Sequence, residues 1–124
     1  MPTGQPLEPI DFAAKIGELP ESDPYEVKKV FIDANLLYIT VQYEASCSGK
    51  DKIELIGSDY LTEAMVPLRQ VKLGIHAGES SCKEFKVKTF IINIRELTAI
   101  KERDFETDLQ IYGWRQKLRY VFVP

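Results

Sequence analysis

The chain has 124 residues, of which 44% are hydrophobic and 28% are charged. This length suits one domain with a core of its own, and the composition excludes disordered, collagen-like and cysteine-dense proteins. The net charge is −3, and the excess of acidic side chains lies in residues 1–26, so the rest of the chain carries no strongly basic balance. Nucleic-acid binding, which usually needs a basic face, is therefore not expected.

The first part of the chain is rich in proline, at Pro2, Pro6, Pro9, Pro20 and Pro24. Proline lacks an amide hydrogen and restricts the residue before it, so regular structure is repeatedly interrupted here. We predict a proline-rich acidic leader over residues 1–25 and a β-sandwich domain over residues 26–124. Residues 10–16 fit two alternatives, either one or two helical turns against the domain or a loosely held arm.

After the leader, apolar and polar side chains alternate, which is the pattern of strands with one buried face. In residues 36–43, for example, Leu37, Ile39 and Val41 fall on one face. Seven strands are predicted, at residues 27–32, 36–43, 52–56, 66–75 (or 68–75), 84–94, 109–112 and 117–123. The turn-rich connections favour an all-β fold, a seven-stranded antiparallel immunoglobulin-like β-sandwich.

Two local features depart from plain strands. The apolar residues of 84–88 and those of 90–94 fall on opposite parities. One flat strand with one buried face does not show this, so we expect a β-bulge near Thr89 or a strand that passes from one sheet into the other. A single helical turn is expected at residues 60–64, because the residues before it resemble a helix start.

The two cysteines, Cys47 and Cys82, leave three alternatives, namely a disulfide, two free thiols or part of a metal site. A metal site would recruit His76 with Glu79 or Asp51, but this spacing matches no structural zinc pattern. The disulfide is favoured, because closing so long a loop would stabilise a small domain. We predict no catalytic residues, no metal and no cofactor, because the single histidine comes with no recognisable triad.

Trp114 follows Gly113 in the predicted turn between the last two strands. A large ring at this place either closes one end of the core or stacks on a ligand. The structural role is favoured. If the chain binds a ligand, the candidate ligand-binding residues are His76, Glu79 and Trp114, which form no strong motif.

Several segments, taken in order, carry a resemblance to a known group. They are the strand before Cys47, residues 52–58, residues 66–73, Cys82 and the Gly-Trp turn in residues 112–120. Over residues 27–123 this order resembles small Bacteroidetes-type envelope lipoproteins of the NigD-like group. The resemblance implies an exported β-sandwich domain of unknown function, with a disulfide and no known enzymatic activity.

Two functions of different classes remain. The favoured one is a non-catalytic interaction module of the cell envelope, located in the periplasm or on the outer-membrane surface of a Gram-negative bacterium. We expect a monomer whose partner is an unknown protein or envelope ligand, with the leader as a spacer from a lipid anchor that tethers it to the membrane. The alternative is a small-ligand or metal-binding protein that uses the loops of Cys47, His76 and Cys82.

Overall fold

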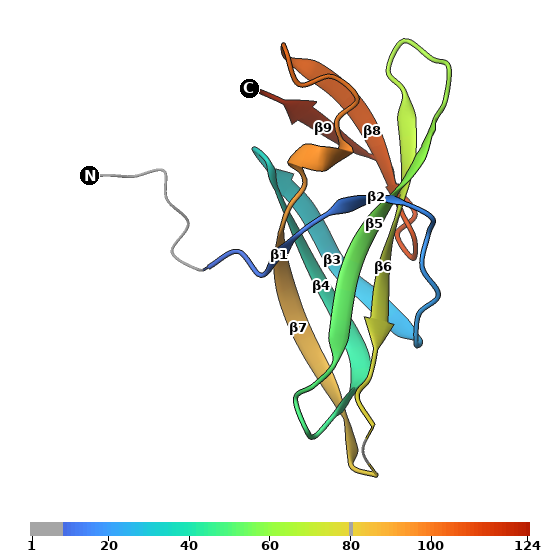
Figure 1. The fold of residues 1–124 in the computed structure, drawn as a ribbon, viewed down its shortest axis with the longest axis vertical. Coiled ribbons are helices and arrows are strands. Elements are labelled where there is room, and N and C mark those ends of the chain that lie inside the picture. The colour runs from blue at the N-terminus through green and yellow to red at the C-terminus, as the bar shows by residue number, and fades with distance from the viewer. Residues whose placement is uncertain (1–8, 80) are drawn as a thin grey trace, which may run out of the picture.

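The computed structural model describes residues 9–79 and 81–124, which form two facing β-sheets (Figure 1). The four-stranded sheet A has the order β1-β7-β4-β3, and the five-stranded sheet B has the order β2-β5-β6-β8-β9. Among the described residues, no helix is long and apolar enough to cross a membrane. The elements are β1 (Phe12–Ala13), β2 (Lys15–Gly17), β3 (Tyr25–Asp33), β4 (Leu36–Ser46), β5 (Lys52–Leu61), β6 (Leu68–His76), β7 (Lys83–Asn93), the 3-10 helix η1 (Arg95–Leu97), β8 (Phe105–Ile111) and β9 (Leu118–Phe122).

The core lies between the two sheets and follows from the alternation in the sequence. In β4, Leu37, Ile39 and Val41 are fully buried, as the period of two predicts. Sheet B supplies the opposing apolar side chains from alternate positions of its strands. The core cluster includes Leu55, Val71, Leu73, Ile75, Leu109, Ile111, Tyr120 and Phe122 from that sheet.

The all-β fold is confirmed, and each of the seven predicted strands is present with extended bounds or small shifts. The prediction of a purely antiparallel, seven-stranded immunoglobulin-like sandwich is wrong. The described residues form nine strands, and three pairings are parallel: β1 with β7, β2 with β5, and β6 with β8. The last of these arises because the chain leaves sheet B after β6, passes through β7 of sheet A and then returns as β8.

The segment Phe12–Gly17, here called the strap, connects the two sheets (Figure 1). Both alternatives for residues 10–16, helical turns and a loosely held arm, are wrong, because this segment forms β1 on sheet A and β2 on sheet B. Ala14, between them, is 1% exposed. A helix of one or two turns leaves most of its amide groups unpaired, whereas two sheet edges offer partners for them. The division of the chain at residue 26 stays a prediction.

β7 keeps one register with β4 from Leu36↔Asn93 to Ser46↔Lys83 and stays in sheet A throughout. The expected bulge near Thr89 and the expected change of sheet are therefore both wrong. The parity break has another cause, which is that the strand reverses its apolar face. Phe90 and Ile92 face the core. Phe85 and Val87 lie on the opposite face and are 72% and 63% exposed.

The segment after β5 also differs from expectation. The helical turn expected at residues 60–64 is wrong, because β5 continues to Leu61 and bends follow it.

Arg69 of β6 is a buried charged residue. It is 4% exposed, and its guanidinium donates to the carbonyl oxygens of Leu97, at 2.9 Å, and of Ser58. This side chain joins β6 to η1 and to β5, and burial lowers its pKa even though Asp59 acts in the opposite direction.

Candidate functional site

Cys47 and Cys82 form the disulfide that was predicted, at the end of the sandwich where β4 ends and β7 begins, which is the lower end in Figure 1. Their Cα atoms lie 5.4 Å apart, and the bond closes a sequence separation of 35 residues. Cys47 follows the last residue of β4 and Cys82 precedes the first residue of β7, which are neighbouring strands of sheet A. The backbone N–H of Cys47 also donates to the carbonyl oxygen of Cys82 at 3.0 Å. The bond occupies both sulfur atoms, so neither is available as a thiolate ligand.

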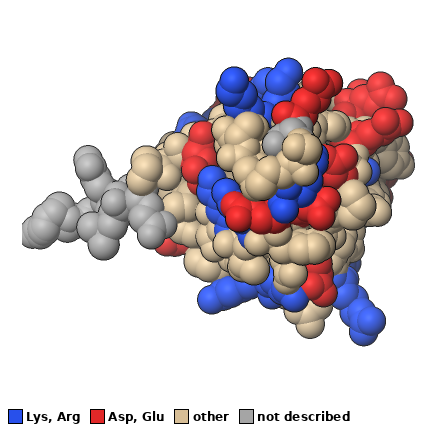
Figure 2. Space-filling view, turned by 90° about the horizontal axis from the view of Figure 1, so that it is seen from below, with Lys and Arg blue, Asp and Glu red and all other residues tan. Residues whose placement is uncertain are grey.

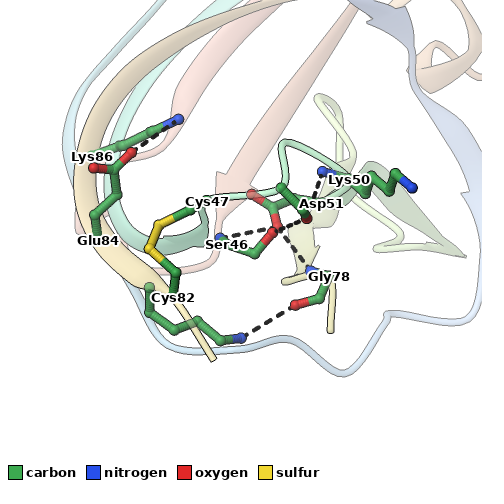
Figure 3. The surroundings of a disulfide bond; sticks show 10 residues. Ser46, Cys47, Lys50, Asp51, Gly78, Cys82, Glu84 and Lys86 are labelled. Carbon is green, nitrogen blue, oxygen red and sulfur yellow. Dashed lines mark hydrogen bonds and ion pairs between the residues drawn. A yellow bond between two sulfur atoms is a disulfide. The ribbon is translucent and has the colours of Figure 1, made fainter. Parts of the chain in front are cut away.

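Asp51 holds the loops next to the disulfide together (Figure 3). Its Oδ1 accepts hydrogen bonds from the backbone N–H of Gly78 at 2.8 Å and of Ser46 at 3.2 Å. Partial burial raises the pKa of this carboxyl, but these hydrogen bonds and the nearby Lys83 outweigh that effect, so the pKa is lowered. Asp51 therefore stays ionised and fixes the β4–β5 loop against the β6–β7 connection.

A hollow of about 540 Å³ opens at the same end of the sandwich. Its walls carry three carboxylates, one lysine and three aromatic rings. Figure 2 looks at this end and shows acidic and basic side chains interspersed, without a large patch of one sign. The lining residues come from the start of β3 and the two residues before it, from β4, from the residue after β6 and from the start of β7: Asp23, Pro24, Tyr25, Glu26, Gln42, Tyr43, Glu44, Ala77, Lys83 and Phe85.

The phenols at this hollow remain protonated. Burial raises the pKa of Tyr25 to about 12, and the neighbouring phenol of Tyr112 adds to this rise. Burial also raises the pKa of Tyr43, and the charge of Asp51 adds to this rise. Both rings therefore present neutral surfaces, and the charge of the hollow comes from its carboxylates and its lysine.

The structure does not bring the three candidate ligand-binding residues together into the hollow. His76 ends β6 and Glu79 lies in the following loop, where both are exposed, and neither lines the hollow. Trp114 lies in the β8–β9 turn and packs, half-buried, against the core cluster. Within residues 9–79 and 81–124 no group of three histidine, cysteine or acidic side chains is placed to hold a metal ion.

The outer face of sheet A is a feature that the sequence reasoning missed. Phe85 and Val87 of β7 point away from the core and are exposed, and Phe31 stacks on Tyr38 on the same outer face, with ring centroids 4.6 Å apart. The parity break within β7 was the signal for this surface, since it moves two large apolar side chains from the inside to the outside. Apart from Phe85, the residues of the hollow carried no such signal, because they come from four distant segments.

Comparison with known proteins adds one structural likeness. A crystal structure of a DUF1344 protein of unknown function from Bacteroides vulgatus is similar, with a TM-score of 0.52 and 10% sequence identity. The match covers 93% of this chain and 57% of that protein, so the chain spans little more than half of its length. Neither a protein-family model nor a curated protein matches the sequence. At this identity the likeness shows the fold alone.

Proposed function

We propose that this protein is a non-catalytic interaction module of the bacterial cell envelope. The observation that carries the proposal is the reversed apolar face of β7, which leaves Phe85 and Val87 72% and 63% exposed. Both side chains are large and apolar, yet they lie on the surface of the domain. Apolar groups that gather on a surface mark a site of contact with other molecules.

Export is supported by the disulfide between Cys47 and Cys82, because such bonds persist mainly in oxidising compartments. We place the protein in the periplasm or on the outer-membrane surface of a Gram-negative bacterium, as a monomer in the NigD-like group. A lipid anchor upstream of the proline-rich segment would provide the membrane tether. The mixed charges at the disulfide end favour a protein or envelope ligand over nucleic acid as the partner (Figure 2).

The full-length gene product, expressed with an epitope tag in its own species, tests this role. We expect it in the envelope fraction, with no thiol open to alkylation before reduction. A photo-crosslinking amino acid in place of Phe85 should give discrete adducts in cells. The same substitution at Tyr60, which is 68% exposed on β5, is the matched control and should give none. A cytosolic protein with reduced thiols, or no adducts from Phe85, would contradict the proposal.

The hollow beside the disulfide favours a second candidate, the binding of a small ligand. Its carboxylates outnumber its lysine, and Tyr25 and Tyr43 are among the aromatic residues that line it, so an aromatic amine would fit its chemistry. A ligand that binds only the folded state raises the unfolding temperature. Such a rise with aromatic amines, lost in Glu44→Gln, would favour this candidate over the interaction module.

A further inference from the structure

Most of β7 has a neighbouring strand on only one side. Its whole length pairs with β4, but β1 pairs with it only at Ile92 and Asn93. The carboxylate of Asp11 accepts the N–H of Ile91 at 2.8 Å and so ends that second ladder. Among the described residues, no strand pairs with residues 83–90 on this side, and we call this stretch the open edge.

The other sheet edges are less suited to accept a strand. β3 has a register shift between Val27 and Lys29, which interrupts its regular pairing pattern. β9 has five residues, and β2 joins the middle of β5 at residues 56–58, which leaves only the short stretches 52–55 and 59–61 of β5 without a neighbour on that side. Short or bulged edges resist the addition of another strand. The open edge of β7 is therefore the longest regular one in the described chain.

Alternate residues of the open edge point their backbone N–H and C=O groups away from β4. The N–H of Ile91 donates to Asp11, and its carbonyl accepts from the N–H of Asp11 at 2.8 Å, so both groups point away from β4. Alternate residues of a strand point their backbone groups the same way. Phe85, Val87 and Thr89 therefore present their N–H and C=O groups along the open edge, while the residues between them bond to β4.

The side chains of the open edge differ on its two faces. Phe85 and Val87 are exposed on the outer face, and Glu84, Lys86 and Lys88 share the inner face. With Lys83, the edge carries three lysines and one glutamate. The three lysines are exposed. The ammonium group of Lys86 lies 3.5 Å from the carboxylate of Glu84, and that of Lys88 lies over the ring of Phe90. Lysines on an edge discourage pairing with an equally basic strand, and they attract an acidic one.

From this geometry we propose that the open edge binds an extended segment of a partner protein in which apolar and acidic side chains alternate. The segment would add a fifth strand to sheet A. Its apolar side chains would pack on Phe85 and Val87, and its carboxylates would lie beside Lys86 and Lys88. Backbone hydrogen bonds supply affinity in this mode of recognition, and alternate side chains supply specificity. The inference rests on the proposed role as an interaction module and names its partner chemistry.

Two synthetic peptides as long as the open edge test the proposal, one of alternating valine and glutamate and one of alternating valine and lysine. They are titrated into the isotope-labelled full chain and followed by NMR. We expect the glutamate peptide to shift amide signals of residues 83–90 and to bind at least about tenfold more tightly than the lysine peptide. Binding that weakens with added salt would fit the same charge pairing.

Three variants locate the binding. Val87→Pro removes an N–H that points to the open edge and leaves the bonds to β4 in place, so affinity should fall at least about tenfold. Val87→Thr keeps the amide and the branched shape but replaces a methyl group by a hydroxyl, so its affinity should fall clearly less than that of Val87→Pro. The double variant Lys86→Glu and Lys88→Glu should prefer the lysine peptide. Thermal unfolding checks that each variant is folded.

Several results would overturn the proposal. They are unchanged affinity in folded Val87→Pro, signal shifts confined to β3, to β9 or to the residues of the hollow outside β7, and binding that appears only after residues 1–8 are removed. Self-association that Val87→Pro abolishes would assign the edge to a second copy of the chain and would also overturn it. Adducts from position 85 in cells, without peptide binding at the edge, would leave the interaction module standing and refute strand addition alone.

Discussion

The strap and the disulfide hold two parts of the sandwich in different ways (Figure 1). The strap pairs Phe12 with Ile92 in sheet A and Lys15 with Ile56 in sheet B, so one short segment joins both sheets. The disulfide joins β4 to β7, which already are neighbours within sheet A. It closes a long loop covalently, but it adds no strand to any edge.

This difference explains which parts of the surface stay accessible for binding. Around the strap, the sheet edges are covered by backbone pairing and the facing side chains are buried. At the disulfide end, Asp51 and the covalent bond fix the loops, while the edge of β7 and the adjacent hollow stay accessible. Segments with few buried contacts are those from which binding elements are usually drawn. The covalent bond therefore supplies order at an end that keeps its edge open.

Removal of the strap should have the largest effect on stability. A chain that begins at residue 18 loses both short strands and the buried Ala14, and it uncovers the apolar ends of both sheets. We expect the loss of a large share of the 5 to 15 kcal/mol that such domains typically have. Urea unfolding measures this loss, and a chain that begins at residue 9 is the control. Equal stability of the two chains would show that the strap contributes little.

Removal of the disulfide should have the second largest effect. Replacement of Cys47 and Cys82 by serine releases a loop of 35 residues in the unfolded chain, which should cost about 3 to 4 kcal/mol of unfolding free energy. Chemical denaturation of the oxidised and serine forms gives the difference. Reduction of the wild type should reproduce most of it. A serine form as stable as the oxidised protein would mean that the Asp51 contacts alone order this end.

The sequence predicted those elements whose signal is local. β4 shows a period of two along its length, and the disulfide was favoured from two cysteines beside predicted strands. The strap was missed because its few residues are extended only through pairing with β7 and β5, which are distant in the sequence. The parity break in β7 was visible, but pattern alone does not distinguish a bulge from a strand that reverses its apolar face. The hollow was missed because no single segment forms it.

Loss of the buried Arg69 should destabilise the region near the strap. In Arg69→Met the carbonyl oxygens of Leu97 and Ser58 lose their donor, while most of the side-chain volume remains. Buried acceptors left without partners should cost about 2 kcal/mol. Arg119→Met is the control, because that guanidinium is exposed and pairs with Asp108 on the surface. Thermal and urea unfolding compare the two, and a larger loss in the control would contradict a structural role for Arg69.

The smallest effect is expected from Tyr120→Phe. The hydroxyl of Tyr120 donates to Oδ1 of Asn35 at 2.6 Å, and Asn35 lies in the tight turn between β3 and β4. Removal of this hydrogen bond should lower the free energy of unfolding by about 1 kcal/mol at neutral pH. The ring itself stays, so the core keeps its packing. Urea unfolding at neutral pH measures this first part of the prediction.

The second part concerns alkaline pH. Burial raises the pKa of Tyr120 from its usual 10.0 to about 12, against a smaller lowering effect of Arg95. Between these two values the unfolded chain releases the proton while the folded chain keeps it, so stability falls as the pH rises from 10 to 12. Tyr25 contributes a similar fall, because burial raises its pKa to about 12 as well. Tyr120→Phe should therefore have a shallower alkaline slope than the wild type, and parallel curves would show that the hydroxyl of Tyr120 ionises normally in the folded protein.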